Sequence, residues 1–171
     1  TEKLINCTKI KTGAKILLHA VQKPESFGVA KINDKKKIIQ IKEKPKKFIS
    51  NLAITGLYFF DNKVINYSKY LKPSKRNELE MIDLLNNYKR NNKLKAEFLG
   101  RGGAWLDTGS INDFYNTSAF VSALENRQGF KIACLEEIAF KSKWINKKDI
   151  KKAISFYGNC IYSNYLKKII Q

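Results

Sequence analysis

Strand-like and helix-like segments alternate along most of this chain, and that alternation limits the folds it can adopt. The predicted strands share a run of apolar or aromatic residues bounded by turn formers, at residues 14–21, 27–32, 37–42, 53–60 and 94–99. Asn33-Asp34 joins the second and third runs and favours a hairpin turn. Over residues 77–90, apolar positions recur at helical spacing, with acids early and bases late, which predicts an amphipathic helix. The pattern indicates an α/β fold with a mixed sheet.

The last part of the chain has a different character. Ser110 and Asp113 have the spacing of a capping box, so a helix is predicted to begin there. Strand-like runs end before Gln128, and short helices are expected at residues 136–141, 148–156 and 162–169. We therefore predict two domains, a mixed α/β part over residues 1–126 and a helical subdomain over residues 127–171.

The formal net charge of +18 first points to a polyanion partner, because clustered Lys and Arg displace counterions from nucleic acid. Of the 33 basic residues, however, 29 are Lys and only 4 are Arg, whose planar fork is the usual grip on phosphates and bases. The lysines are spread along the chain with many Asn and Ile, as an AT-rich coding sequence would produce. Composition therefore argues against a nucleic-acid partner, although a basic nucleic-acid-binding protein stays open as an alternative.

Cysteine usage and hydropathy point to an intracellular setting. Cys7, Cys134 and Cys160 are odd in number and lack paired spacing, which argues against a zinc site or a disulfide framework. No apolar run approaches the ~20 residues needed to span a bilayer, and the amino end lacks a signal-type stretch. We expect a cytoplasmic protein with no membrane partner.

Glu43-Lys44-Pro45 and Gly28 are the first candidate ligand residues. Pro45 stops the second hairpin strand, so Glu43 and Lys44 can both reach one pocket. The carboxylate suits sugar hydroxyls and the ammonium suits a phosphate, although a solvated surface pair would have the same sequence. Gly28 opens the facing strand, where the missing side chain would either admit a ligand close to the backbone or form a bulge.

Asp107 lies in a glycine-flanked turn between a predicted strand and a helix start, where α/β proteins place ligand groups. A carboxylate there suits Mg²⁺, and a helix-capping role is the alternative. Trp105 would either wall a sugar site or join the core. Arg76, one of few arginines, would reach a phosphate.

Several short motifs occur in a fixed order: Phe27-Gly28-Val29, Glu43-Lys44-Pro45, Thr55-Gly56-Leu57-Tyr58-Phe59, Leu71-Lys72-Pro73-Ser74 through Arg76, Glu78-Leu79-Glu80, Asp83, Gly100-Arg101-Gly102, Ala104-Trp105-Leu106-Asp107-Thr108-Gly109, Arg127-Gln128-Gly129 and Glu136-Glu137-Ile138-Ala139. The ordered set resembles the sugar-1-phosphate nucleotidylyltransferase family, and within it the glucose-1-phosphate thymidylyltransferases. It implies the mixed-sheet portion of a nucleotide-diphospho-sugar transferase fold, which is Rossmann-like, with a helical carboxyl-terminal subdomain. The chain would be the family's carboxyl-terminal part, without the nucleotide-binding first half.

The resemblance implies that glucose 1-phosphate and dTTP are converted into dTDP-glucose and pyrophosphate, with Mg²⁺ as cofactor, in nucleotide-sugar biosynthesis of the dTDP-rhamnose type. Residues 1–126 would then be the sugar- and metal-binding part. The roles carried over by similarity are sugar binding by Gly28, Glu43 and Ile54, phosphate binding and catalysis by Lys44 and Arg76, and Mg²⁺ binding by Asp107.

The resemblance also implies a regulatory nucleotide-sugar site near a homo-oligomer interface, formed by Gly100, Arg101, Gly102, Ala133, Glu137 and Ile138. The family's glycine-rich triphosphate loop and its second Mg²⁺-binding aspartate precede every motif found here. We therefore expect the isolated chain to be inactive, and a non-catalytic remnant or regulatory fragment is the alternative to an enzyme.

Overall fold

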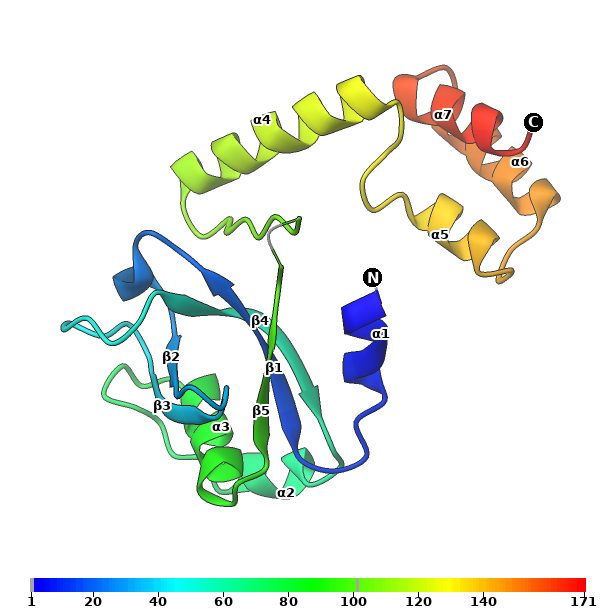
Figure 1. Cartoon of the computed structure of the whole chain (residues 1–171). Helices are drawn as coiled ribbons and strands as arrows, with labels where there is room; N and C mark the ends of the chain where they lie inside the picture. The colour runs from blue at the N-terminus through cyan, green and yellow to red at the C-terminus, as the bar shows by residue number, and fades with distance from the viewer. Residues whose placement is uncertain (1, 101) are drawn as a thin grey trace. The chain divides into compact units, whose positions relative to one another are not determined.

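The computed structural model describes residues 2–100 and 102–171 (Figure 1). The chain divides into two compact units, Thr1–Trp105 and Leu106–Gln171, and each is described by itself. The predicted domain boundary between residues 126 and 127 falls near the end of a long helix of the second unit. The division into a sugar- and metal-binding part over residues 1–126 and a helical subdomain over residues 127–171 stays a prediction.

The first unit is built on a mixed five-stranded sheet in the order β3-β2-β4-β1-β5. Its elements are α1 (Glu2–Thr8), β1 (Ala14–Ala20), a 3₁₀ turn (Pro24–Ser26), β2 (Val29–Ile32), β3 (Ile38–Lys42), β4 (Leu52–Phe60), α2 (Val64–Lys69), α3 (Met81–Arg90) and β5 (Leu94–Phe98). β1 pairs with β5 in parallel and with β4 antiparallel, and the hairpin β2–β3 joins β4 at its start. These pairings confirm the predicted mixed α/β fold.

The main core lies between the sheet and α3. The apolar stripe of α3 buries Ile82, Leu85 and Tyr88 against residues of β1, β3 and β4. An amphipathic helix gains most of its stability from packing of this kind rather than from helix propensity alone. The packing fixes the amino end of α3 beside the carboxyl end of β3, and these two ends build the candidate site.

A buried carboxylate ties β1, β4 and α3 together at the opposite end of the sheet. Asp61 follows β4 directly and accepts hydrogen bonds from the backbone N–H of Gly13 at 2.7 Å and of Lys63 at 3.1 Å. The Tyr88 hydroxyl of α3 donates to the same carboxylate at 2.8 Å. Burial pushes the pKa of Asp61 upward, but these three donors outweigh it and hold its pKa below the usual range.

β4 contains a bulge where it faces β1, and on the side of β2 it pairs with a neighbouring strand over only a short stretch. Residues 55–57 of β4 lie opposite Leu17 of β1 alone, and Gly56 occupies φ +78° in this bulge, a conformation that favours glycine. On its other side, β4 pairs with β2 only around Ala53. Beyond Ile54, no strand among the described residues pairs with that edge.

The second unit is helical and comprises α4 (Ile111–Gln128), α5 (Leu135–Lys141), α6 (Lys147–Tyr157) and α7 (Ile161–Ile169). The backbone N–H of Asp113 donates to Ser110 Oγ at 3.1 Å, which confirms the predicted helix start. A small core around Cys134, Ile150 and Leu166 holds the last three helices together. In contrast, α4 has no buried residue.

One predicted helix boundary was wrong, and one helix was not predicted. Helix α3 begins at Met81 rather than residue 77, because the preceding loop turns at Asn77, where φ is +60°. Helix α2 was not predicted, since it spans only six residues, of which Val64 and Tyr67 pack against the core without being fully buried. The hairpin turn predicted at Asn33-Asp34 is present, since the Asn33 carbonyl accepts the backbone N–H of Lys36 at 2.8 Å, and Lys36 is its left-handed residue at φ +57°.

None of the helices in the described part of the chain is both long and apolar enough to cross a membrane.

Candidate functional site

A groove of about 540 Å³ opens where β3 ends beside the first turn of α3. One wall is the segment that follows β3, and the other is the loop that leads into α3. The lining residues are Ile41, Lys42, Glu43, Lys44, Ser74, Lys75, Arg76, Glu80, Ile82, Asp83 and Asn86. The groove therefore brings Glu43, Lys44 and Arg76 together from two separate segments.

Glu43 is half-buried and fits closely against Gly28. A Cβ added at Gly28 would lie 2.9 Å from Glu43 Oε2 and 3.1 Å from Ile82 Cδ1, so this carboxylate position requires glycine at residue 28. Burial raises the pKa of Glu43, and the charge of Glu80 raises it further, against the opposing effects of Arg76 and Lys44. A carboxyl group of this kind is suited to accepting hydrogen bonds from hydroxyl groups.

Lys44 leaves the strand in an unusual conformation. Its φ is +36°, which an L-residue with a side chain rarely adopts, and its backbone N–H donates to the carbonyl of Phe27 at 3.1 Å. This turn breaks the alternation of the strand, so the exposed Lys44 and the half-buried Glu43 both line one groove.

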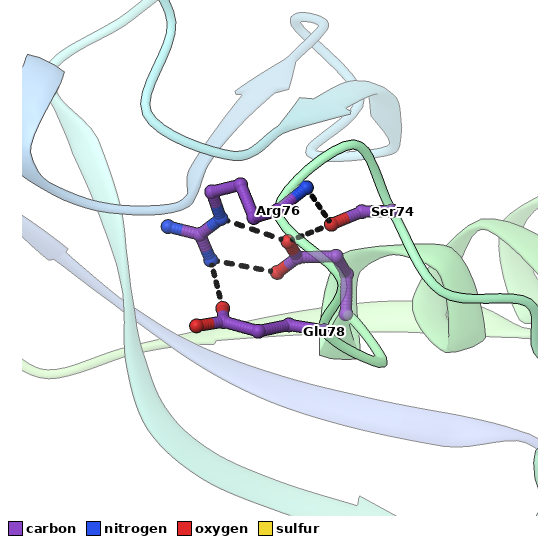
Figure 2. A network of polar contacts seen from close by, with 4 residues as sticks. Ser74, Arg76 and Glu78 are labelled. Carbon is purple, nitrogen blue, oxygen red and sulfur yellow. Dashed lines mark hydrogen bonds and ion pairs between the residues drawn. The ribbon is translucent and has the colours of Figure 1, made fainter.

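Arg76 is held in a polar network in the loop before α3 (Figure 2). Its Nε and Nη2 donate to Glu80 at 3.0 and 3.1 Å, and Nη2 also donates to Glu78 at 2.7 Å. Ser74 Oγ donates to Glu80 Oε1 at 2.8 Å and accepts the backbone N–H of Arg76 at 3.1 Å. The hydrogen bonds with Glu80 raise the pKa of Arg76, and those from Arg76 lower the pKa of Glu80.

Ile54 and Trp105 do not line this groove. Ile54 is buried in the core, and its backbone N–H donates to the carbonyl of Gly28 at 2.8 Å. Trp105 Nε1 donates to the carbonyl of Thr55 at 3.1 Å, and its ring packs edge-on against Phe27, with centroids 4.9 Å apart. Both residues therefore adjoin the backbone that carries Gly28, and their predicted sugar contacts stay predictions.

Asp107 lies in the second unit, so its placement relative to the groove is not defined. It is exposed, and the cap of α4 is Ser110, so the alternative helix-capping role of Asp107 is wrong. Among the described residues, no group of three or more His, Cys, Asp or Glu side chains could hold a metal ion. Since Mg²⁺ is commonly held by one or two carboxylates together with substrate phosphates, Asp107 fits as one such ligand and not as a complete site.

The residues predicted for a regulatory site are divided between the two units. In the first unit, Gly100 and Gly102 are exposed in a turn closed by a 2.9 Å hydrogen bond from Gly103 N–H to the Gly100 carbonyl, and Arg101 lies outside the described residues. In the second, Ala133 is exposed at φ +54°, and Glu137 and Ile138 lie in α5. Tyr165 and Lys141 donate to the Glu137 carboxylate. Because the placement of the two units relative to one another is not defined, the regulatory site stays a prediction.

Sequence reasoning assigned no role to Ser74 and Glu80. Both line the groove, and Glu80 holds Arg76 by two hydrogen bonds. The sequence does contain a signal that points to these two residues, because both lie within the ordered motifs around Arg76. A helix that began at residue 77 would instead place Glu80 within its first turn, whereas α3 begins at Met81 and Glu80 belongs to the loop.

Curated relatives of the chain have consistent names. A glucose-1-phosphate thymidylyltransferase from Neisseria gonorrhoeae is 40% identical over 158 residues, which are 92% of this chain and 55% of the relative. One from Xanthomonas campestris pv. campestris (strain B100) is 42% identical over 154 residues, 90% of this chain and 52% of the relative. The chain spans about half the length of the curated relatives it matches.

Solved structures and a protein family also match the chain. A Bacillus anthracis structure, assigned as a glucose-1-phosphate thymidylyltransferase in complex with sucrose, matches with a TM-score of 0.59 and 43% identity over 70% of this chain and 46% of that one. A UDP-glucose pyrophosphorylase in complex with UDP-glucose, at 23% identity and a TM-score of 0.56 over 63% of this chain and 43% of that one, shares the fold. Residues 3–123 match the nucleotidyl transferase family, and the chain belongs to that family.

Proposed function

We propose that this chain supplies the sugar-phosphate side of a glucose-1-phosphate thymidylyltransferase, which forms dTDP-glucose and pyrophosphate from glucose 1-phosphate and dTTP. The observation that carries the proposal is the groove itself, where the half-buried Glu43 carboxylate converges with the cations of Lys44 and Arg76 from two separate segments. The names of the relatives support the choice of substrates.

Each residue of the groove has a chemical role in this proposal. Glu43 accepts hydrogen bonds from glucose hydroxyls, and Gly28 keeps its carboxylate free of steric contact. Lys44 and Arg76 bind the phosphate dianion, where charge-assisted hydrogen bonds are stronger than neutral ones. Glucose 1-phosphate is then oriented with its phosphate at Lys44 and Arg76 and its hydroxyls at Glu43.

The chemistry is a displacement at phosphorus. An oxygen of the sugar phosphate forms a new bond to the α-phosphorus of dTTP, and the bond from that phosphorus to the β-phosphate oxygen breaks, releasing pyrophosphate. Lys44 and Arg76 hold the attacking oxygen in place and reduce the repulsion between the two anions. Mg²⁺, for which Asp107 would be one ligand, neutralises the triphosphate when bound.

The triphosphate site is expected in the part of the relatives that this chain does not cover, so the test uses two samples. Mg²⁺-dependent pyrophosphate release from dTTP and glucose 1-phosphate is measured with the chain alone and after addition of the amino-terminal half of a relative. We expect activity only in the second sample. Lys44→Ala and Glu43→Ala should abolish it, while Lys31→Ala, at an exposed position of β2, should not.

Two outcomes would contradict the proposal. Activity of the chain alone would require a triphosphate site among its own residues. A folded chain that stays silent with the added half, and that binds no glucose 1-phosphate in a titration, would favour a non-catalytic remnant.

A further inference from the structure

The network around Arg76 contains one carboxylate that is much less exposed than the other. The side chain of Glu80 is 14% exposed, while those of Glu78 and Arg76 are 62% and 45% exposed. The Glu80 carboxylate is also held by Ser74, whose hydroxyl donates a hydrogen bond to Oε1. The Glu78 carboxylate has only its one hydrogen bond with Nη2 among the described residues. The two acids therefore differ in how firmly they constrain the arginine.

The geometry of the ion pair determines which part of Arg76 remains available. Glu80 takes Nε and one N–H of Nη2 in a side-on fork, which fixes the plane of the guanidinium. Within the described part of the chain, Nη1 has no hydrogen-bond partner, so its two N–H groups are available to a ligand in the groove. An arginine held in this way loses less conformational freedom on binding a phosphate than a free one does.

We propose that Glu80, supported by Ser74, is a positioning residue that orients Arg76 for the phosphate of the sugar substrate. This inference rests on the proposed function. Glu80 does not touch the phosphate and acts through the guanidinium. The competing interpretation is that Glu80 neutralises Arg76 and must be displaced, in which case its removal would strengthen phosphate binding.

The test compares two conservative variants of neighbouring acids. Binding of glucose 1-phosphate is measured by calorimetric titration for the wild-type chain, Glu80→Gln, Glu78→Gln and Arg76→Met. We expect Glu80→Gln to weaken binding by about tenfold, since the loss of preorganisation and of one charge-assisted bond is of that order. Glu78→Gln should change binding by less than about twofold, because exposed ion pairs contribute little.

A coupling measurement separates positioning from general support of the loop. In the Arg76→Met background, Glu80→Gln should cause no further loss of binding, because its effect passes through the arginine. The ¹⁵N-labelled Nε–H signal of Arg76, assigned by its loss in Arg76→Met, should exchange with water faster in Glu80→Gln than in Glu78→Gln. Ser74→Ala should weaken binding less than Glu80→Gln, and Ser74→Thr, which keeps the hydroxyl, should restore it.

The outcomes distinguish this inference from the proposed function. If Arg76→Met weakens binding while Glu80→Gln has no more effect than Glu78→Gln, the function stands and the positioning role is overturned. Tighter binding by Glu80→Gln, or an equal loss in the Arg76→Met background, would also overturn it. A folded wild-type chain that binds no glucose 1-phosphate would overturn the proposed function and this inference with it, before any variant is made.

Discussion

At Gly28, a hydrogen atom occupies the place where any side chain would meet Glu43. Local sequence pattern left open whether this glycine admits a ligand or forms a bulge. The structure gives a third reason, since a Cβ there would lie 2.9 Å from the Glu43 carboxylate. Gly28 thus affects the groove indirectly, because it leaves the space that the Glu43 carboxylate needs.

Gly28→Ala should therefore displace the Glu43 carboxylate. We expect glucose 1-phosphate to bind about tenfold more weakly, and the free energy of unfolding to fall by about 1–2 kcal/mol because the added methyl group overpacks the site against Ile82. Titration and urea unfolding measure the two effects. Ser26→Ala, at an exposed position nearby, is the control, and unchanged binding in Gly28→Ala would contradict this account.

Lys44 combines a strained backbone conformation with a side chain proposed to bind phosphate. Two substitutions separate the effect of the backbone on stability from the effect of the side chain on binding. Both Lys44→Ala and Lys44→Gly should weaken glucose 1-phosphate binding by about tenfold, because each removes one charge-assisted hydrogen bond. Lys44→Gly should be about 1 kcal/mol more stable than Lys44→Ala, since glycine relieves the φ of +36°. Equal thermal stability of the two variants would show that the backbone turn carries no strain.

At the scale of elements, the Asp61 carboxylate fixes the start of β1, the end of β4 and α3 in one arrangement. That arrangement determines the placement of α3, and so of the loop that carries Arg76. A hydrogen-bonded carboxylate with a lowered pKa stabilises the fold above its unfolded pKa, about 3.9, and this contribution is lost as the pH falls.

Asp61→Asn should lower the free energy of unfolding at pH 7 by about 3 kcal/mol, because an amide cannot accept all three hydrogen bonds and leaves a buried donor unpaired. Between pH 5 and pH 2, the wild type should lose more stability than this variant, since the variant has no carboxylate to protonate. Urea unfolding across this range provides the measurement. Asp34→Asn, in the exposed hairpin turn, is the control and should behave as the wild type. If the stability of Asp61→Asn and of the wild type fell in parallel with pH, the predicted direction of the pH dependence would be wrong.

Sequence alone predicted those elements that carry a local signal, either an apolar pattern or a helix cap. The strands β1 to β5 and the helices α3 to α7 were found because apolar runs, apolar spacing or caps mark them. The start of α3 was missed because Leu79 fits the helical spacing, while the hydrogen bonds of Ser74 and Arg76 hold residues 74–80 as a loop. The meeting of Glu43 with Arg76 depends on long-range packing of α3 on the sheet, so only the family resemblance pointed to it.

At the scale of the whole molecule, charge is the most prominent property. The net charge of +18 comes mostly from lysines spread along the chain, and lysines at many positions of both units are exposed. Such a surface attracts polyanions without reading a sequence. The nucleic-acid-binding alternative can therefore be separated from adsorption by its salt dependence.

We expect the chain to bind immobilised DNA only at low salt and to elute by roughly 200 mM, because non-specific binding by counterion release weakens steeply with salt. The elution point should not change with DNA sequence or in Arg76→Met. Retention above this salt concentration, or preference for one sequence, would revive the nucleic-acid-binding alternative.

The open edge of β4 has a consequence for handling the chain in solution. Since no strand in the described part of the chain pairs with this edge beyond Ile54, it can pair with an extended polypeptide, including another copy of the same strand. Slow, concentration-dependent aggregation during purification and storage would follow, although the high net charge opposes it. A cosolute or partner chain that covers this edge would extend the usable lifetime of a sample, so the yield of monomeric protein becomes a practical measure of whether the edge is covered.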